Sequence, residues 1–153
     1  MTAPKSPKAA KPRASRPSRP NRPSPSEIAP GVYVGGWHDA GAFEGARFCV
    51  LDEAPAEMPK ATHVPIYDEG TDRADVGKLD RLAEGMAKAR ARGEPVLVFC
   101  GHGVRRSPLG AVWYFHRAHG LSLDAAYDRV RAVRPQIEHA RDWVGNADEL
   151  EAA

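Results

Sequence analysis

The sequence predicts a single α/β domain with a central, mostly parallel sheet of four to five strands flanked by helices. Two observations predict this class. Strand and helix signals alternate from about residue 27 to the end of the chain, and VLVF at 96–99 is an uninterrupted apolar run, typical of a parallel strand buried on both faces. With 153 residues and 42% hydrophobic side chains, the chain is long enough for one core and too short for two ordinary domains.

Three further strands are expected before that apolar run. VYV at 32–34 is a short strand closed by two glycines, and RFCVLD at 47–52 is a second strand with an apolar centre. THVPIYD at 62–68 is the third. Its Pro65 indicates a sheet edge or the end of a strand, because proline cannot donate to a hydrogen-bond ladder.

Two long helices are predicted on either side of the apolar strand. Over 73–91, apolar residues recur at helical spacing, and the pattern stops at a glycine. From Ser107 onward the chain is helical again, and its segment LGAVWYFHRAH is apolar almost all round, as expected for a central helix. The aromatic side chains at 113–115 cannot share one helix face, so we interpret them as core residues.

Two shorter helices follow. Ser122 is typical of an N-cap for a helix over 123–133, and Pro135 ends that helix. A last helix is expected from about His139 to Leu150.

The N-terminal segment differs in charge from the rest of the chain. Residues 1–26 hold seven Lys or Arg, seven Pro and no acid, whereas residues 27–153 carry 15 basic and 20 acidic side chains, a net charge of −5. Its prolines disfavour helix and strand, so we predict a disordered tail at 1–26 and a folded domain at 27–153. Two interpretations stay open for this tail: a solubilising spacer, or a weak contact arm for nucleic acid or an anionic membrane.

Composition also bears on location. No apolar run approaches the roughly 18 residues of a membrane span, and the N-terminus lacks the apolar core of a secretory signal. Two cysteines, Cys49 and Cys100, are too few for a disulfide framework and lack the spacing of a zinc site. We therefore expect a cytoplasmic protein without a transmembrane segment.

Cys100 ends the apolar strand, and the loop after it opens a helix. Loop amides and a helix N-terminus form a frequent anion site, and such a site lowers the pKa of a thiol and makes it a nucleophile. Arg106, six residues on, is able to grip two phosphoryl oxygens with its planar fork. Gly101 and Gly103 remove side chains that would crowd the oxyanion.

The residues CGHGVRRS at 100–107 resemble the Cys-x5-Arg-Ser/Thr signature loop of the cysteine-dependent protein tyrosine phosphatase superfamily. The segments APGVYVGG, VPIYDEG and VRPQIEHARDWV are similar to ordered elements of its dual-specificity branch. The resemblance runs from about Ile28 to Leu150 and implies a protein tyrosine phosphatase-like fold. We call residues 100–106 the signature loop.

The resemblance implies a role for each site residue. Cys100 would attack phosphorus and form a cysteinyl-phosphate, Asp68 would protonate the leaving oxygen and then activate water, and Ser107 would assist the departing sulfur. No metal or cofactor is implied. The phosphate would be held by the remainder of the signature loop: Gly101, His102, Gly103, Val104, Arg105 and Arg106.

Several assignments stay open from the sequence. Asp72 lies on the same loop as Asp68 and is the alternative acid. The family usually has His before the nucleophile, and here that position is Phe99, which predicts weaker thiol activation. His102 would either compensate for this or face solvent or substrate. Arg105 would either add positive potential at the site or pair with a carboxylate of the domain.

Cys49 has two interpretations, a packed strand residue or a thiol that pairs with Cys100 under oxidation.

The expected activity is metal-independent hydrolysis of phosphotyrosine in proteins, with phosphoserine and phosphothreonine as an open addition. The partner is thus a phosphorylated protein, and we expect a monomer. Two alternatives remain: a phosphatase for a phosphoinositide or an RNA 5′-phosphate, and a non-catalytic phosphate-binding module.

Overall fold

The computed structural model describes residues 25–54, 57 and 60–144, and its main sheet confirms the predicted class. Within these residues the strands are ordered β1-β2-β7-β3-β4. In this main sheet only the β1–β2 pair is antiparallel, and the other three pairs are parallel. The bounds are β1 Ser26–Ala29, β2 Val32–Gly36, β7 Val96–Cys100, β3 Ala46–Cys49 and β4 Thr62–His63. The predicted apolar strand is therefore the central one.

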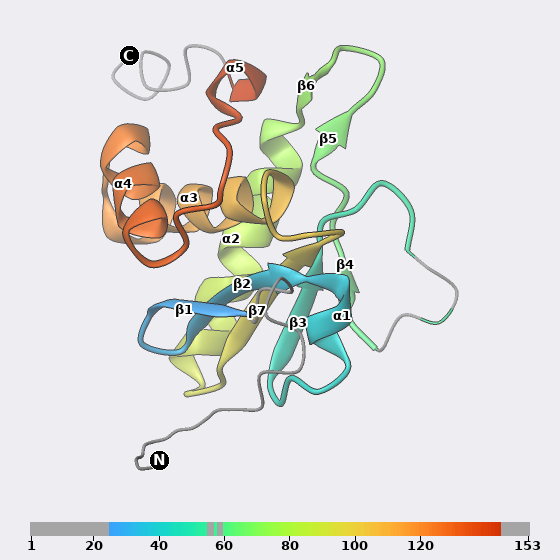
Figure 1. The fold of residues 1–153 in the computed structure, drawn as a ribbon, viewed down its shortest axis with the longest axis vertical. Coiled ribbons are helices and arrows are strands. Elements are labelled where there is room, and N and C mark those ends of the chain that lie inside the picture. The colour runs from blue at the N-terminus through green and yellow to red at the C-terminus, as the bar shows by residue number, and fades with distance from the viewer. Residues whose placement is uncertain (1–24, 55–56, 58–59, 145–153) are drawn as a thin grey trace, which may run out of the picture.

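Helices cover the two faces of the sheet unequally (Figure 1). The long helices α2 (Val76–Ala91), α3 (Arg106–His119) and α4 (Leu123–Val133) lie on one face with α5 (Arg141–Val144), and the short α1 (Trp37–Ala40) lies on the other. Side chains of β7 alternate between the faces, because successive residues of a strand point to opposite sides. Cys100 thus faces the large core beneath the long helices, and Phe99 faces a small cluster beside α1.

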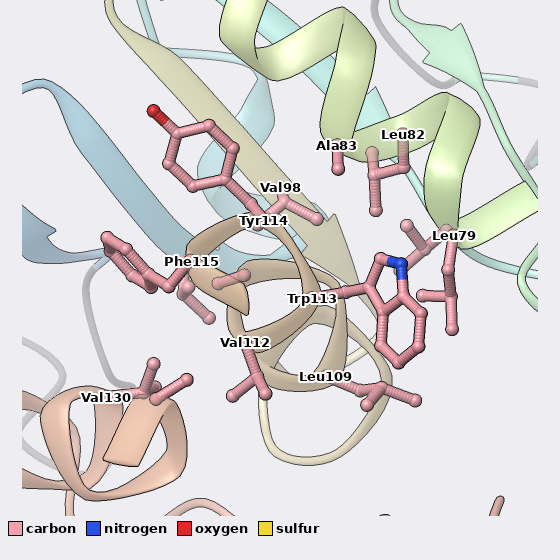
Figure 2. Close-up of a cluster of buried hydrophobic side chains, with 14 of the residues drawn as sticks. Leu79, Leu82, Ala83, Val98, Leu109, Val112, Trp113, Tyr114, Phe115 and Val130 are labelled. Atoms are coloured by element: carbon pink, nitrogen blue, oxygen red, sulfur yellow. The ribbon is translucent and has the colours of Figure 1, made fainter. Parts of the chain in front are cut away.

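The large core is built around α3, as its sequence predicts. Figure 2 shows side chains leaving this helix in several directions, Trp113 on the side of Leu79 and Phe115 on the side of Val130. Trp113, Tyr114 and Phe115 are all buried. The Trp113 indole N–H donates to Asp80 at 2.7 Å, so its polar atom is satisfied. The interpretation of residues 113–115 as core is confirmed.

The strand expected at 62–68 is wrong as a single element. Pro65 divides it into β4, on the main sheet, and β5 (Tyr67–Asp68), which pairs antiparallel with β6 (Arg73–Ala74) in a separate hairpin. Since β6 takes residues 73–74, α2 begins later than expected. Asp75 is its N-cap, accepting from the Lys78 amide at 3.1 Å.

The other helix boundaries follow the sequence closely. The Ser122 hydroxyl accepts from the Ala125 amide at 3.1 Å, which confirms the predicted N-cap of α4. The last helix begins at Arg141, two residues later than expected, and is described as far as Val144; residues 145–150 of the expected helix lie outside the described residues. Strand β1 and helix α1 were not predicted.

The predicted tail also falls outside the described residues, except for its last two positions; β1 begins at Ser26. Among the described helices, none has both the length and the apolar character that a membrane span requires.

Candidate active site

The signature loop lies at the carboxyl end of the central strand. Residues 101–105 leave β7, and Arg106 is the first residue of α3. Gly103 has φ of +71°, a conformation that side chains rarely adopt. Within the described part of the chain, no hydrogen bond donated by the amides of residues 102–106 is found. These N–H groups are therefore available to the oxygens of an anion.

The underside of the loop is held by a buried arginine. Arg134 is fully buried; its Nε donates to the Gly103 carbonyl at 2.7 Å, its Nη2 to the His102 carbonyl at 3.3 Å and its Nη1 to Ser26 Oγ at 2.9 Å. Burial lowers the pKa of Arg134, and the charges of Asp39 and Cys100 oppose this shift.

These contacts also set the direction of the loop amides. In a trans peptide the N–H points opposite to the preceding C=O. The carbonyls of His102 and Gly103 face Arg134, so the amides of Gly103 and Val104 face the other way. The Val104 carbonyl accepts from the Glu138 amide at 2.7 Å, which turns the next amide away as well. The N–H groups of the loop thus point away from Arg134 and the Glu138 amide, the two groups that bind its carbonyls.

The thiol of Cys100 lies beside a hydroxyl at the start of α3. Its Sγ is 3.3 Å from Ser107 Oγ, and Ser107 Oγ is 3.2 Å from the Gly35 carbonyl. Cys100 is 5% exposed and Ser107 is fully buried. Because a hydroxyl has one proton, Ser107 is able to donate either to the carbonyl or to a thiolate on Cys100.

Arg106 is held at the mouth of the loop. Its Nη1 lies 3.4 Å from Asp52 Oδ1, and its guanidinium lies 5.1 Å from the centre of the Tyr67 ring. Arg106, the last residue of the signature loop, thus has two neighbours, Asp52 and Tyr67, that sequence reasoning missed.

Arg105 also has a carboxylate partner. Its Nη2 is 3.9 Å from Asp142 Oδ1, and its guanidinium stacks over Trp143 at 4.5 Å. Of the two open interpretations of Arg105, pairing with a carboxylate is the one this geometry supports. The side chain of His102 is exposed, so it faces solvent at the mouth.

The two candidate acids lie in the β5–β6 hairpin and differ in their contacts. Asp72 accepts a hydrogen bond from the Tyr67 hydroxyl, and this contact raises the pKa of Tyr67. Asp68 is exposed and accepts the Gly70 amide at 3.0 Å. Both carboxyls are exposed; that of Asp72 is engaged by a side chain, whereas that of Asp68 is engaged only by a backbone amide of its own turn.

The second cysteine does not face the loop. Cys49 is fully buried in the small cluster with Ala40, Leu97 and Phe99, on the face of the sheet opposite to Cys100. Burial raises its pKa. The structure therefore supports the packed interpretation of Cys49 over pairing with Cys100, and it shows Phe99 as a core side chain of the same cluster.

Arg134 is the main site residue that sequence reasoning missed. It belongs to the quoted segment VRPQIEHARDWV, so its place in the chain was noted but its partner was not. Nothing in the local pattern indicates that its guanidinium reaches a loop about thirty residues earlier. Asp52 was missed for a similar reason, since it was counted as the end of a strand.

A parallel sheet whose central strand ends in a buried thiol, followed by a glycine loop and an arginine at a helix N-terminus, defines the class of cysteine-dependent phosphatases. Residues 50–150 match the family described as dual specificity phosphatase, catalytic domain. The chain belongs to this family and is a cysteine-based protein phosphatase.

Relatives and solved structures agree with this assignment. The chain is 30% identical to human dual specificity phosphatase 28 over 121 residues, covering 72% of this chain and 68% of that protein. The mouse protein of the same name is 29% identical over 123 residues, covering 74% and 75%. The crystal structure of human DUSP28 superimposes with a TM-score of 0.73 at 26% identity, covering 86% of this chain and 97% of that one.

Proposed function

We propose that this phosphatase hydrolyses phosphotyrosine in proteins through a cysteinyl-phosphate on Cys100. The observation that carries the proposal is the 3.3 Å contact between Cys100 Sγ and Ser107 Oγ beside a loop whose amides carry no partner among the described residues. A buried thiol beside a hydroxyl donor and unpaired amides suits a nucleophile that meets a dianion.

In the first step the Cys100 thiolate attacks phosphorus. The S–P bond forms as the P–O bond to the leaving group breaks, and Asp68 gives its proton to the departing oxygen. Arg106 and the amides of residues 101–106 hold the other phosphoryl oxygens as charge shifts in the transition state.

In the second step water attacks phosphorus and the S–P bond breaks. Asp68, now a carboxylate, takes the proton from the water, and the electron pair of the S–P bond returns to sulfur. Ser107 turns its hydroxyl proton from the Gly35 carbonyl toward Cys100 and so stabilises the leaving thiolate.

The mouth of the loop supports a tolerant choice of protein substrates. The side chain of Arg106 is 28% exposed, and Asp68 is exposed. A phosphate bound there lies near the surface, so shorter phosphoserine and phosphothreonine side chains reach it as well as phosphotyrosine. Relatives that are named dual specificity protein phosphatases favour a protein substrate over the phosphoinositide and RNA alternatives, and over a module that only binds phosphate.

We further propose that the enzyme is monomeric and cytoplasmic, with the basic tail adding a weak contact to nucleic acid or an anionic membrane. The most exposed large apolar side chains of the described residues, Trp37, Val76 and Val133, lie on three different helices, which supports a monomer. The two free thiols are consistent with a reducing compartment.

Hydrolysis of para-nitrophenyl phosphate in EDTA tests the mechanism. We expect Cys100→Ser to lower kcat at least about 10⁴-fold and Arg106→Lys to lower kcat/KM about 10²-fold. With phenyl phosphate, whose leaving group is poor, Asp68→Asn lowers kcat/KM about 10²-fold, whereas the matched Asp72→Asn keeps an acceptor for Tyr67 and stays within about threefold of wild type. Full turnover in Cys100→Ser would overturn the mechanism, and a reversed order of the two aspartate variants would reassign the acid.

A further inference from the structure

Two arginines and two aromatic residues form a continuous row of contacts at the mouth of the signature loop. The Arg106 guanidinium lies 5.1 Å from the Tyr67 ring centre, and the Tyr67 and Trp143 ring centres are 4.7 Å apart. The Arg105 guanidinium lies 4.5 Å from the Trp143 ring centre. We call these four residues the aromatic clamp. The clamp links three separate parts of the chain: the signature loop, the β5–β6 hairpin and α5.

We propose that Tyr67 and Trp143 are positioning residues of the phosphatase reaction: they fix the Arg106 guanidinium and hold the Asp68 hairpin beside the signature loop. The inference deepens the proposed function and rests on it for the roles of Arg106 and Asp68.

The clamp limits the orientations open to Arg106. Tyr67 packs on its guanidinium, and Asp52 pairs with Nη1 at one edge. A planar fork fixed by one face and one edge keeps its remaining N–H groups for a bidentate contact with phosphate. Since a free arginine loses several rotamers when it binds a ligand, holding the side chain beforehand strengthens phosphate binding.

The clamp also determines where the acid lies. The strands β5 and β6 have two residues each, too few for a hairpin to be stable alone. Tyr67 precedes Asp68 directly; its hydroxyl donates to Asp72 across the hairpin, and its ring packs on Trp143. Helix α5 packs against β6 and completes the attachment. Contacts made by Tyr67 and Trp143 therefore fix the hairpin that carries the acid.

Trp143 is in turn tied to the loop through Arg105. Trp143 is 7% exposed, and Arg105 contacts both its ring and, at 3.9 Å, the carboxylate of Asp142 next to it. The two arginines are adjacent in sequence, so the clamp begins and ends on the signature loop. A shift of α5 would thus move Tyr67, and with it both Arg106 and Asp68.

The test compares Tyr67→Leu with a matched aromatic pair elsewhere. Tyr33 packs on Phe43 with ring centres 5.2 Å apart, outside the large core that holds Cys100, so Tyr33→Leu removes a similar contact away from the loop. Each variant is assayed with phenyl phosphate, a poor leaving group, and 2,4-dinitrophenyl phosphate, a good one. The inhibition constant of inorganic phosphate and the Tm are also measured.

We expect Tyr67→Leu to lower kcat/KM about tenfold more for phenyl phosphate than for 2,4-dinitrophenyl phosphate, because kcat/KM reports formation of the cysteinyl-phosphate and only the poor leaving group needs the acid in that step. Its inhibition constant for phosphate rises about fivefold, and this rise disappears in the Arg106→Lys background. Tyr67→Phe keeps the ring and shows a smaller change. Trp143→Phe, which preserves most of the packing, stays near wild type, and Trp143→Leu follows Tyr67→Leu.

If Tyr67→Leu and Tyr33→Leu both lower the Tm while neither changes the leaving-group dependence or the phosphate constant, the clamp is only structural and the inference is wrong. Failure of the proposed function has a different signature, because it appears in Cys100→Ser and Asp68→Asn themselves. If Asp68→Asn shows no leaving-group effect, the acid is misassigned, and the phosphate constant of Tyr67→Leu alone then decides on the clamp.

Discussion

The underside and the mouth of the signature loop are built from different interactions. On the underside, Arg134 and Ser107 are fully buried and contact backbone carbonyls. At the mouth, Arg105 and Arg106 are partly exposed and are held by carboxylates and aromatic rings.

The contacts on the underside therefore hold the backbone of the signature loop, whereas those at the mouth orient side chains that bind phosphate. A buried carbonyl that loses its donor keeps its desolvation cost, whereas an exposed ion pair contributes little to stability. Substitutions on the underside should therefore lower stability and activity together, and substitutions at the mouth should lower activity alone. Four predictions test this separation, from the largest effect on activity to the smallest.

Replacing Arg134 should have the largest effect. Arg134→Met leaves the carbonyls of Gly103 and His102 without their donors, so we expect the free energy of unfolding to fall by about 3 kcal/mol. Misplaced loop amides should lower kcat/KM about 10²-fold. Urea unfolding and steady-state kinetics measure the two effects. The control, Arg131→Met, removes a half-exposed arginine of α4 whose partner Asp128 is at the surface, and it should change neither. An active, stable Arg134→Met would refute the role of the underside.

Gly103→Ala should have the next largest effect, with Gly101→Ala as its control. At Gly103, φ is +71° and an added Cβ would lie 2.5 Å from Arg134 Nη2 and 2.7 Å from the Gly35 carbonyl carbon. At Gly101 nothing lies within 4 Å of an added Cβ. We expect Gly103→Ala to lower kcat/KM at least about tenfold and the Tm by several degrees, in thermal melts and kinetics, since backbone strain costs about 1–3 kcal/mol. Equal behaviour of the two variants would contradict this geometry.

Replacing Asp52 tests whether a contact at the mouth affects phosphate binding without affecting stability. Asp52→Ala removes the partner of Arg106 and should weaken inhibition by inorganic phosphate about threefold without changing the Tm, because the pair is exposed. Asp52→Asn keeps an acceptor at the same place and should lie between that variant and wild type. A drop in Tm would show that Asp52 stabilises the fold, as the residues of the underside do, and would contradict the prediction.

Cys49 should have the smallest effect on activity. Cys49→Ala should keep kcat/KM within about twofold, since the thiol faces the opposite cluster. Its raised pKa predicts a pH effect on stability. As the pH rises above the ordinary value of 9.0, the thiol ionises in the unfolded chain while the folded state resists ionisation, so this contribution to stability is lost with rising pH.

Urea unfolding at pH 7 and at alkaline pH should therefore show a larger loss of stability for wild type than for Cys49→Ala. Iodoacetamide at neutral pH should label Cys100 and leave Cys49 unmodified until the chain unfolds. Rapid labelling of Cys49 in the folded protein would contradict its burial.

The sequence predicted the elements whose signals are local. The apolar run of β7, the all-round apolar α3 and the Ser122 cap each depend on neighbouring residues, and the structure has all three. Strand β1 and helix α1 were missed because they have four residues each and carry no clear period. Pro65 was noticed, but the pattern on its two sides does not reveal that they join different sheets.

The candidate site shows the same limit. Cys100, Arg106 and Ser107 lie on one loop and fall within one motif. The partners that shape the loop, such as Arg134 and Tyr67, come from other elements, and their contacts depend on how helices and hairpin pack. Such contacts leave no periodic trace in the sequence, so only the structure identifies them.

The position of β7 within the sheet has a consequence for folding. Strands β2 and β3 never pair with each other; each pairs with β7, which follows both in the chain. A nascent chain that ends before residue 96 therefore has two open strand edges, which favour aggregation. The main sheet is completed only when β7, which lies far along the chain from β2, pairs with both strands. Such non-local pairing is typical of slow-folding topologies. The strand that carries Cys100 is also the strand that completes the sheet, so an incompletely folded chain cannot present its reactive thiol in a formed site.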